Sequence, residues 1–252
     1  MSDQSQNAPI IAAFDAAADS YDAASKVQRA IARKLVARAA QHLVTPPKTI
    51  LDLGSGAGHV TGAALELWPE ADIVALDAAP AMLAALRVKY PGVKTLRRDA
   101  SKLDGVERYD LILSSMMLHW LPDPRAALTQ WREKLNPGGK LHVAVPVEGS
   151  LSEWRDFLRA AGVPDGLWRF PPPDLGRDAA ASAETIPFAA SYPDARAFLQ
   201  SLKRTGAHTA RPGHRPSSTA ALRRLLAARQ GEFTATFQIL FLTIEASQSE
   251  QG

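Results

Sequence analysis

The sequence predicts an α/β fold: a doubly wound, mostly parallel sheet of seven strands with helices on both faces. Two observations favour it. Short apolar runs alternate along the chain with segments of helical length, as in parallel strands joined by crossover helices. The 252 residues contain 46% hydrophobic and 22% charged side chains, a balance that suits one large globular domain. The crossover connections are expected to be right-handed.

Residues 1–47 are expected to form one or two amphipathic helices that pack on the core. Apolar residues recur there at every fourth position: Val27, Ile31, Leu35, Ala39 and Leu43. Basic side chains fall between them, so one face is apolar and the other is charged. Thr45-Pro46-Pro47 ends the pattern, because proline supplies no backbone donor and restricts the residue before it.

Residues 48–252 are expected to hold the whole sheet. Its strands are predicted at residues 49–53, 72–76, 93–97, 109–113, 140–145, 184–192 and 233–245. Helices are predicted between the early strands at residues 60–68, 80–90 and 124–135, and after the fifth strand at residues 151–161. Asn136-Pro137-Gly138-Gly139 is expected to end the third of these helices and to turn into the next strand.

Two segments are expected to cap this domain, at about residues 150–183 and 193–231. The first holds a proline-rich loop, RFPPP. The second separates the last two strands, and its pattern predicts helices at residues 194–205 and 217–230. A connection of this length exceeds what a hairpin needs, so a helical cap is predicted.

Composition excludes several kinds of site. The chain has no cysteine, which rules out disulfides, thiolate catalysis and cysteine metal ligands. The histidines form no recognisable metal pattern, so no metal is expected. No apolar run is long enough to span a bilayer, and the N-terminal segment carries aspartate but no Lys or Arg, unlike a secretory signal. A cytoplasmic protein is therefore expected.

Positive charge is concentrated in one segment. The chain has a net charge of +3, but residues 195–231 contain no Asp or Glu. The basic residues of this segment are Arg196, Lys203, Arg204, Arg211, Arg215, Arg223, Arg224 and Arg229. Such a field attracts an acidic partner, whether nucleic acid, an anionic membrane or an acidic protein. A solvated helical face would show the same pattern.

The strongest chemical signal is the segment ILDLGSGAGHV. An apolar strand runs into Gly54, Gly56 and Gly58, and a helix follows. Glycines let the chain turn tightly and bring its backbone against a ligand beside a helix N-terminus. The dinucleotide fingerprint requires a glycine where His59 stands, and Asp52 lies just before the loop, so both features disfavour NAD.

Polar residues also end the neighbouring strands. Asp77 closes the second predicted strand, Asp99-Ala100 follows the third, and Ser114-Ser115 follows the fourth. In an open α/β sheet, ligands bind at these carboxyl ends near the point where strand order reverses. A carboxylate at the position of Asp77 can accept hydrogen bonds from both hydroxyls of a ribose.

Together, LDLGSGAG, ALDAAPAML, RRDA, YDLILSS and LNPGGKL resemble the class I S-adenosylmethionine-dependent methyltransferases, in the order of that family. The resemblance implies S-adenosylmethionine as the cofactor. It implies that Gly54, Ser55 and Gly56 line the methionine moiety, Asp77 holds the ribose, Met82 packs near the adenine and Asp99 receives its amino group. The other cofactor-binding residues expected are Tyr21, Asp52, Ala78, Ala100 and Ser114. Asp52 could instead brace the loop, and Met82 could belong to the core.

A closer resemblance covers almost the whole chain. AAFDAAADSYDAASKVQR, SSMMLHWLPD, VEGSLSEW, RFPPPD and FLQSLKRTGA are similar to segments of the biotin-pathway malonyl-acyl-carrier-protein O-methyltransferases. This resemblance implies methyl esterification of the free carboxylate of a malonyl thioester on an acidic acyl carrier protein. The acceptor carboxylate is ionised near neutral pH, so alignment with the sulfonium methyl, rather than a general base, is expected to drive the transfer.

The acceptor site is expected to use a basic residue, since a guanidinium can grip a carboxylate through two parallel hydrogen bonds. Arg169 is the first candidate, and Arg29 and Lys203 are the others, with Ser115 close by. Surface charge is the alternative role for each basic residue. The basic segment is expected to face the acidic carrier protein.

His119 and Trp120 are expected beside the transferred methyl, where they orient or shape the site. His119 could act as a base, but the expected reaction gives it no proton to take, and core packing is the alternative. Other acceptors stay open: malonyl-CoA, or a small free carboxylic acid as in the trans-aconitate methyltransferases. An RNA-binding methyltransferase or a non-catalytic assembly factor is a further alternative, although the sequence has no recognisable RNA-binding module. The oligomeric state is not predicted.

Overall fold

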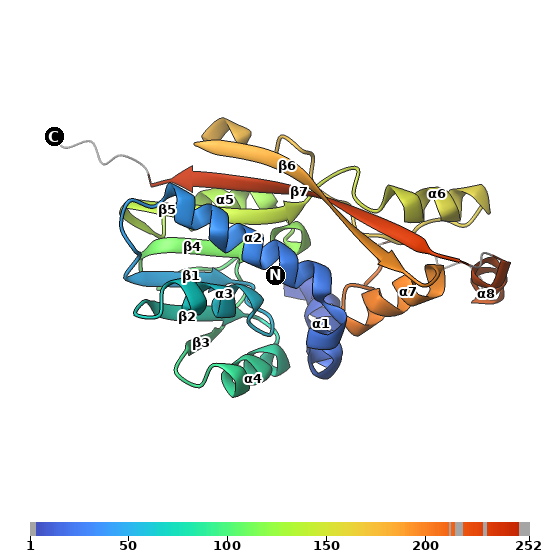
Figure 1. Ribbon diagram of the computed structural model, residues 1–252, viewed down its shortest axis with the longest axis horizontal. Coiled ribbons are helices and arrows are strands. Elements are labelled where there is room, and N and C mark those ends of the chain that lie inside the picture. The colour runs from blue at the N-terminus through green and yellow to red at the C-terminus, as the bar shows by residue number, and fades with distance from the viewer. Residues whose placement is uncertain (1–3, 212, 215–218, 229–230, 247–252) are drawn as a thin grey trace.

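A seven-stranded sheet organises the computed structural model, which describes residues 4–211, 213–214, 219–228 and 231–246 (Figure 1). The sheet order is β3-β2-β1-β4-β5-β7-β6. The parallel strands are β1 (Thr49–Leu53), β2 (Asp72–Asp77), β3 (Lys94–Arg97), β4 (Tyr109–Ser115) and β5 (Leu135–Pro146). β7 (Phe233–Glu245) runs antiparallel to β5 and to β6 (Ser182–Tyr192). The predicted doubly wound, mostly parallel sheet is confirmed.

The strand order reverses between β1 and β4. The chain proceeds from β1 outward to β2 and β3, then returns to β4 on the other side of β1 and continues to β5. The loops that follow these strands therefore meet at one edge of the sheet, next to the reversal. Gly54, Asp77, Asp99 and Ser115 follow or end β1 to β4 at this edge, whereas the motif LNPGGKL lies at the opposite edge, where β4 begins.

Two N-terminal helices precede the sheet, and their boundary lies at Ser25. α1 (Gln4–Ala24) and α2 (Lys26–His42) both lie within the segment predicted to be helical, and α2 ends before the two prolines. The apolar face of α2 packs beside α3 (His59–Leu67) on β4 and β5. α1 instead lies between α4 (Pro80–Lys89) and α7 (Ala195–Arg204), as Figure 1 shows. This places α1 beside the carboxyl edge of the sheet.

The start of β5 differs from the prediction. α5 (Pro124–Arg132) ends earlier than predicted, and β5 already begins at Leu135. Tyr109 pairs with Leu135 and Leu111 pairs with Lys140, so the predicted turn Asn136-Pro137-Gly138-Gly139 is a bulge inside the strand. The bulge is held by a hydrogen bond of 2.7 Å from Asn136 Nδ2 to Asp110 Oδ1.

β6 and β7 form a long antiparallel pair whose connection carries helices. β6 pairs with β7 over the whole of β6, and α7 and α8 (Thr219–Ala228) lie in the chain between them. One end of this pair extends beyond the parallel strands toward α6 (Ser152–Ala160), α7 and α8 (Figure 1). The predicted helix at residues 217–230 includes four residues outside the described part of the chain. Within that part, no helix is long and apolar enough to cross a membrane.

Candidate active site

The loop after β1 is built on glycines in the left-handed region. Gly54, Gly56 and Gly58 have φ angles of 70°, 50° and 91°. Gly54 and Ser55 donate backbone hydrogen bonds of 2.8 and 3.0 Å to the carbonyl of Leu76, which ties the loop to β2. A Cβ at Gly54 would lie 2.2 Å from Met117 Cγ. Glycine is therefore required at position 54 by both backbone conformation and space.

Asp77 connects two loops of the site. Its Oδ2 accepts a hydrogen bond of 2.8 Å from the amide of Gly56, and its Oδ1 accepts one of 2.8 Å from the amide of Ala79. Burial raises the pKa of this carboxyl, against the opposing effect of these amides. The carboxylate thus has a fixed orientation at the end of β2.

A first cavity of about 740 Å³ opens beside this carboxylate. Its walls come from α1 and from the loops after four parallel strands. The residues that line it are Asn7, Ile10, Ile11, Phe14, Tyr21, Gly54, Gly56, Leu76, Asp77, Ala78, Ala79, Met82, Arg98, Asp99, Ala100, Ser115, Met116, Met117, Trp120 and Leu121. Ten of the residues that the sequence selects for cofactor or substrate therefore share one cavity: Tyr21, Gly54, Gly56, Asp77, Ala78, Met82, Asp99, Ala100, Ser115 and Trp120.

Three of the predicted cofactor residues do not line the first cavity. Asp52 is buried, and its Oδ2 accepts a hydrogen bond of 2.6 Å from Thr61 Oγ1. Ser114 lies inside β4 rather than after it, and its hydroxyl donates a hydrogen bond of 2.9 Å to the carbonyl of Leu53. Ser55 has a buried hydroxyl without a partner among the described residues. All three side chains are buried, so they belong to the packed interior rather than to the cavity wall.

Asp52 is held in an apolar environment. Burial raises its pKa to about 7, although the hydrogen bonds from Thr61 oppose this change. Its Oδ1 is also buried and has no partner within the described part of the chain. The bracing role that the sequence left open fits this geometry better than direct contact with a ligand in the cavity.

α1 closes the first cavity through contacts that the sequence analysis missed. Asp15 accepts a hydrogen bond of 2.6 Å from the amide of Ala81 in α4, and Asp22 forms an ion pair with Lys89. Tyr21 stacks on His59 with 5.6 Å between the ring centroids. Burial, followed by the charge of Asp77, raises the pKa of Tyr21 well above its usual value. No local pattern reveals these contacts, because each joins α1 to a residue far along the chain.

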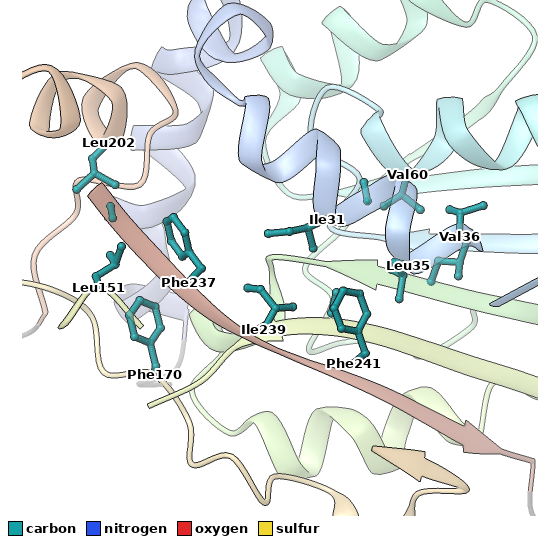
Figure 2. Close-up of a cluster of buried hydrophobic side chains, with 14 of the residues drawn as sticks. Ile31, Leu35, Val36, Val60, Leu151, Phe170, Leu202, Phe237, Ile239 and Phe241 are labelled. Carbon is teal, nitrogen blue, oxygen red and sulfur yellow. The ribbon is translucent and has the colours of Figure 1, made fainter. Parts of the chain in front are cut away.

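A second cavity of about 570 Å³ adjoins the first. Its lining residues are Phe14, Tyr21, Gln28, Met116, His119, Trp120, Pro146, Leu151, Leu167, Trp168, Phe170, Leu202, Thr205, Ala207 and Phe237. Phe14, Tyr21, Met116 and Trp120 line both cavities. Figure 2 shows four of the apolar lining residues, Leu151, Phe170, Leu202 and Phe237, gathered around the first half of β7.

His119 lies in a 3-10 turn, Leu118–Trp120, after β4. Its side chain is 5% exposed, and its ring centroid lies 4.8 Å from that of Trp120 and 5.6 Å from that of Phe170. Burial lowers the pKa of His119 to about 3, so the ring is neutral at neutral pH. Its Nδ1 is buried and has no hydrogen-bond partner among the described residues. The aromatic neighbours position a neutral polar ring at the second cavity.

The basic residues predicted for the acceptor do not line the second cavity. Arg169 is exposed and borders an outer cleft of about 1330 Å³, together with Arg125 and Arg211. The next residue, Phe170, is buried in its place, because an apolar ring is far less costly to bury than a guanidinium. Arg29 donates to the carbonyl of Asp22 from the exposed side of α2.

Lys203 and most of the described basic segment face solvent. Lys203 is exposed on α7 and lines neither of the first two cavities. The other exposed basic residues of the segment are Arg196, Arg204, Arg223 and Arg224. Arg211 is different, since it forms an ion pair of 3.0 Å with Asp165. Arg215 and Arg229 lie outside the described residues. Within the described residues, no group of three or more His, Asp or Glu could hold a metal ion.

Comparisons with known proteins identify the fold and the family. A family model described as a methyltransferase domain matches residues 50–139. The biotin biosynthesis bifunctional protein BioCD of Bordetella avium is 33% identical over 90% of this chain, although the chain spans only 50% of that protein. The structure of the plantazolicin methyltransferase BpumL in complex with SAH shares the fold at a TM-score of 0.56 and 13% identity, covering 96% of this chain and 95% of that one.

Another relative matches over nearly its full length. The malonyl-acyl-carrier-protein O-methyltransferase of Serratia marcescens is 30% identical, and the alignment covers 92% of this chain and 93% of that protein. The similarity extends well beyond the part of the chain that builds the first cavity. The chain belongs to the malonyl-acyl-carrier-protein O-methyltransferase family of class I methyltransferases.

Proposed function

We propose that this chain transfers a methyl group from S-adenosylmethionine to the free carboxylate of a malonyl thioester carried by an acyl carrier protein. The observation that supports this most directly is the common wall of the two cavities, Phe14, Tyr21, Met116 and Trp120. A methyl group bound at that wall in the first cavity faces an acceptor that enters the second. The identity of the acceptor, a malonyl group, is inferred from the names of the relatives.

The first cavity fits an adenosine-containing cofactor. Gly54 and Gly56 have no side chains, so a ligand can approach their backbone closely. The nearest atom to a Cβ built at Gly56 would be the hydroxyl oxygen of Tyr21, 4.0 Å away. Asp77 is oriented by two amides and can accept further hydrogen bonds from ribose hydroxyls. Asp99 Oδ1 accepts from Ser101, and its carboxylate borders the same cavity. The cofactor supplies an activated methyl group, and these residues bind and orient it.

The remaining predicted residues have positioning roles in this proposal. Met82 is 1% exposed and lies against the first cavity, where it would pack on the adenine. Ser115 and Trp120 border the same cavity nearer the second one. No proton has to be removed from an ionised carboxylate, so the proposed reaction depends on alignment and exclusion of water.

The carrier protein would approach the outer cleft and the exposed basic residues of the cap. The outer cleft shares His119, Trp168 and Phe170 with the second cavity, so an acyl arm could reach from one to the other. An acidic carrier would be attracted by Arg223 and Arg224, which are exposed on α8. The double variant Arg223→Glu/Arg224→Glu should slow the carrier reaction at low salt and leave the cofactor affinity unchanged.

A direct assay tests the proposed function. The purified chain is mixed with S-adenosylmethionine and with malonyl carrier protein, malonyl-CoA or trans-aconitate, and the methyl ester is measured by mass spectrometry. We expect a methyl ester on the malonyl thioester, with the carrier form used fastest. Absence of affinity for S-adenosylhomocysteine, or methylation of trans-aconitate alone, would contradict the proposal.

A further inference from the structure

The second cavity has an uncharged lining, which is unusual for a site that binds a carboxylate. Among the residues that the structure describes, none with a formal charge lines it. Arg125, Arg169 and Arg211 border the outer cleft instead, and Arg155 lies over the ring of Phe170 without lining the second cavity. A carboxylate that enters this cavity therefore leaves water without meeting a cationic side chain.

The polar groups that the second cavity does offer are neutral. Gln28 lines it from α2 at a half-buried position, and no hydrogen bond joins its amide to another described residue. His119 is nine-tenths buried or more, and its Nδ1 is also unpartnered there. Thr205 is already committed, since its hydroxyl hydrogen-bonds the carbonyl of Ser201 at 3.0 Å. A buried polar atom without a partner is costly, which applies to His119 Nδ1. Gln28 is half-buried at the same cavity, and its amide has donors to offer, so these two are the groups that a ligand would satisfy.

Backbone strain marks the same cavity. Met116 and Leu151 have φ angles of 59° and 57°, and within the described residues they are the two non-glycine positions in the left-handed region. Both line the second cavity. Strained backbone of this kind persists where surrounding structure enforces it and is concentrated at functional sites. The strained backbone is a second observation, separate from the polar groups, that supports a binding role for this cavity.

The chemistry of the transfer explains why a neutral site is useful. An oxygen lone pair of the carboxylate forms a bond to the methyl carbon while the bond from that carbon to sulfur breaks, and its electron pair stays on sulfur. A negative carboxylate and a positive sulfonium become a neutral ester and a neutral thioether, and no proton moves. Charge is lost on the way to the transition state, so a cationic side chain would stabilise the reactants more than the transition state. An environment without such a side chain favours the reaction.

We propose that the second cavity binds a single acceptor carboxylate through neutral hydrogen-bond donors, with Gln28 as the principal one, and leaves the sulfonium as its counter-charge. The proposal rests on the methyl transfer proposed above. It also makes the cavity selective: a free di- or tricarboxylic acid would have to bury further charges there without partners, which is costly. A malonyl thioester brings one carboxylate and an uncharged remainder into the cavity.

Substitutions of Gln28 separate binding from reaction. Gln28→Leu removes the donor, and KM for the malonyl acceptor should rise about tenfold or more. Gln28→Arg supplies a counter-charge, so acceptor binding should tighten while kcat falls about tenfold. Gln28→Glu keeps the size and adds a negative charge, and it should weaken acceptor binding by at least about a hundredfold. The control Gln41→Arg adds the same charge at an exposed position of α2 and should change neither constant.

The affinity for S-adenosylhomocysteine, measured by calorimetry, reports on folding and on the first cavity in every variant. It should stay within about twofold of the wild type. If Gln28→Arg loses this affinity, Gln28→Glu still decides the question. This inference is overturned if kcat rises in Gln28→Arg, or if Gln28→Glu is as active as the control. The proposed function stands in either case as long as the wild type is active. A wild-type chain that is inert on malonyl thioesters overturns both.

Discussion

Acid should destabilise this fold through buried neutral histidines, and His142 offers a test outside the proposed site. His142 lies on β5 and is 1% exposed. Its Nδ1 is 3.1 Å from Thr243 Oγ1, and its ring stacks on that of His42 at a centroid distance of 5.4 Å. Burial, followed by the nearby charges of His42, Lys140 and Arg38, lowers its pKa from 6.5 to about 3. The folded protein therefore resists protonation of this ring.

The sign and the size follow from this difference. Above pH 6.5 the ring is neutral in both the folded and the unfolded chain, so it contributes nothing to pH dependence. Below pH 6.5 the unfolded chain binds a proton and the folded chain does not, so stability falls until the pH reaches the folded pKa of about 3. Between pH 7 and pH 5 the loss from His142 is about 2 kcal/mol.

Urea denaturation of the wild type and of His142→Gln, at pH 7 and pH 5, measures this loss. His59 and His119 also have lowered pKa values. The wild type and His142→Gln both retain these two histidines, so the difference in pH dependence between the two proteins isolates His142. The wild type should lose about 2 kcal/mol more than His142→Gln on going to pH 5. His214→Gln, which removes a partly exposed histidine of the cap, should behave as the wild type. If His142→Gln has the same pH dependence as the wild type, the assignment of a neutral buried ring is refuted.

Three further outcomes are expected. Gly54→Ala should lower the affinity for S-adenosylhomocysteine more than tenfold, because its Cβ meets Met117 at 2.2 Å; Gly138→Ala has a similar φ of 76° and open space around it, so calorimetry should show no such loss there. Asp77→Asn should weaken the same affinity by about ten- to a hundredfold, since charge-assisted hydrogen bonds are the stronger ones, and a change below twofold would argue against a ribose contact. Ser25→Ala removes the 2.7 Å contact between Ser25 Oγ and His59 Nε2 and should lower the free energy of unfolding by about 1–3 kcal/mol in urea titrations.

The parallel half of the fold could be predicted because its signals are local. Each early strand is an apolar run followed by a helix-length segment, and the sheet order then follows from short right-handed connections. The start of β5 was harder, because Asn136-Pro137-Gly138-Gly139 contains the residues of a turn but forms a bulge. The hydrogen bond that holds the bulge comes from Asp110 on β4, which is a tertiary contact.

The lining of the first cavity was predictable to the extent that its residues follow strand ends. Gly54, Asp77 and Asp99 line one cavity because the carboxyl ends of parallel strands meet at one edge of the sheet. Asp52 and Ser114 are at the same edge in sequence, but their side chains turn into the packed interior. Which side of a buried strand a residue faces is not visible in a run that is apolar throughout.

The second cavity could not be assembled from sequence, since its walls come from both N-terminal helices, the turn after β4, the start of α6, α7 and β7. The prediction of Arg169 applied a rule for tight binding, in which a carboxylate pairs with a guanidinium. The structure keeps Arg169 outside and buries Phe170. In a reaction that consumes both charges, tight binding of the carboxylate and fast transfer require different surroundings. A strong ion pair lowers the energy of the reactants, so the barrier to the reaction is higher. In the proposed function, an arginine at the cleft mouth would still attract the acceptor, while the neutral interior would preserve the reactivity of its carboxylate.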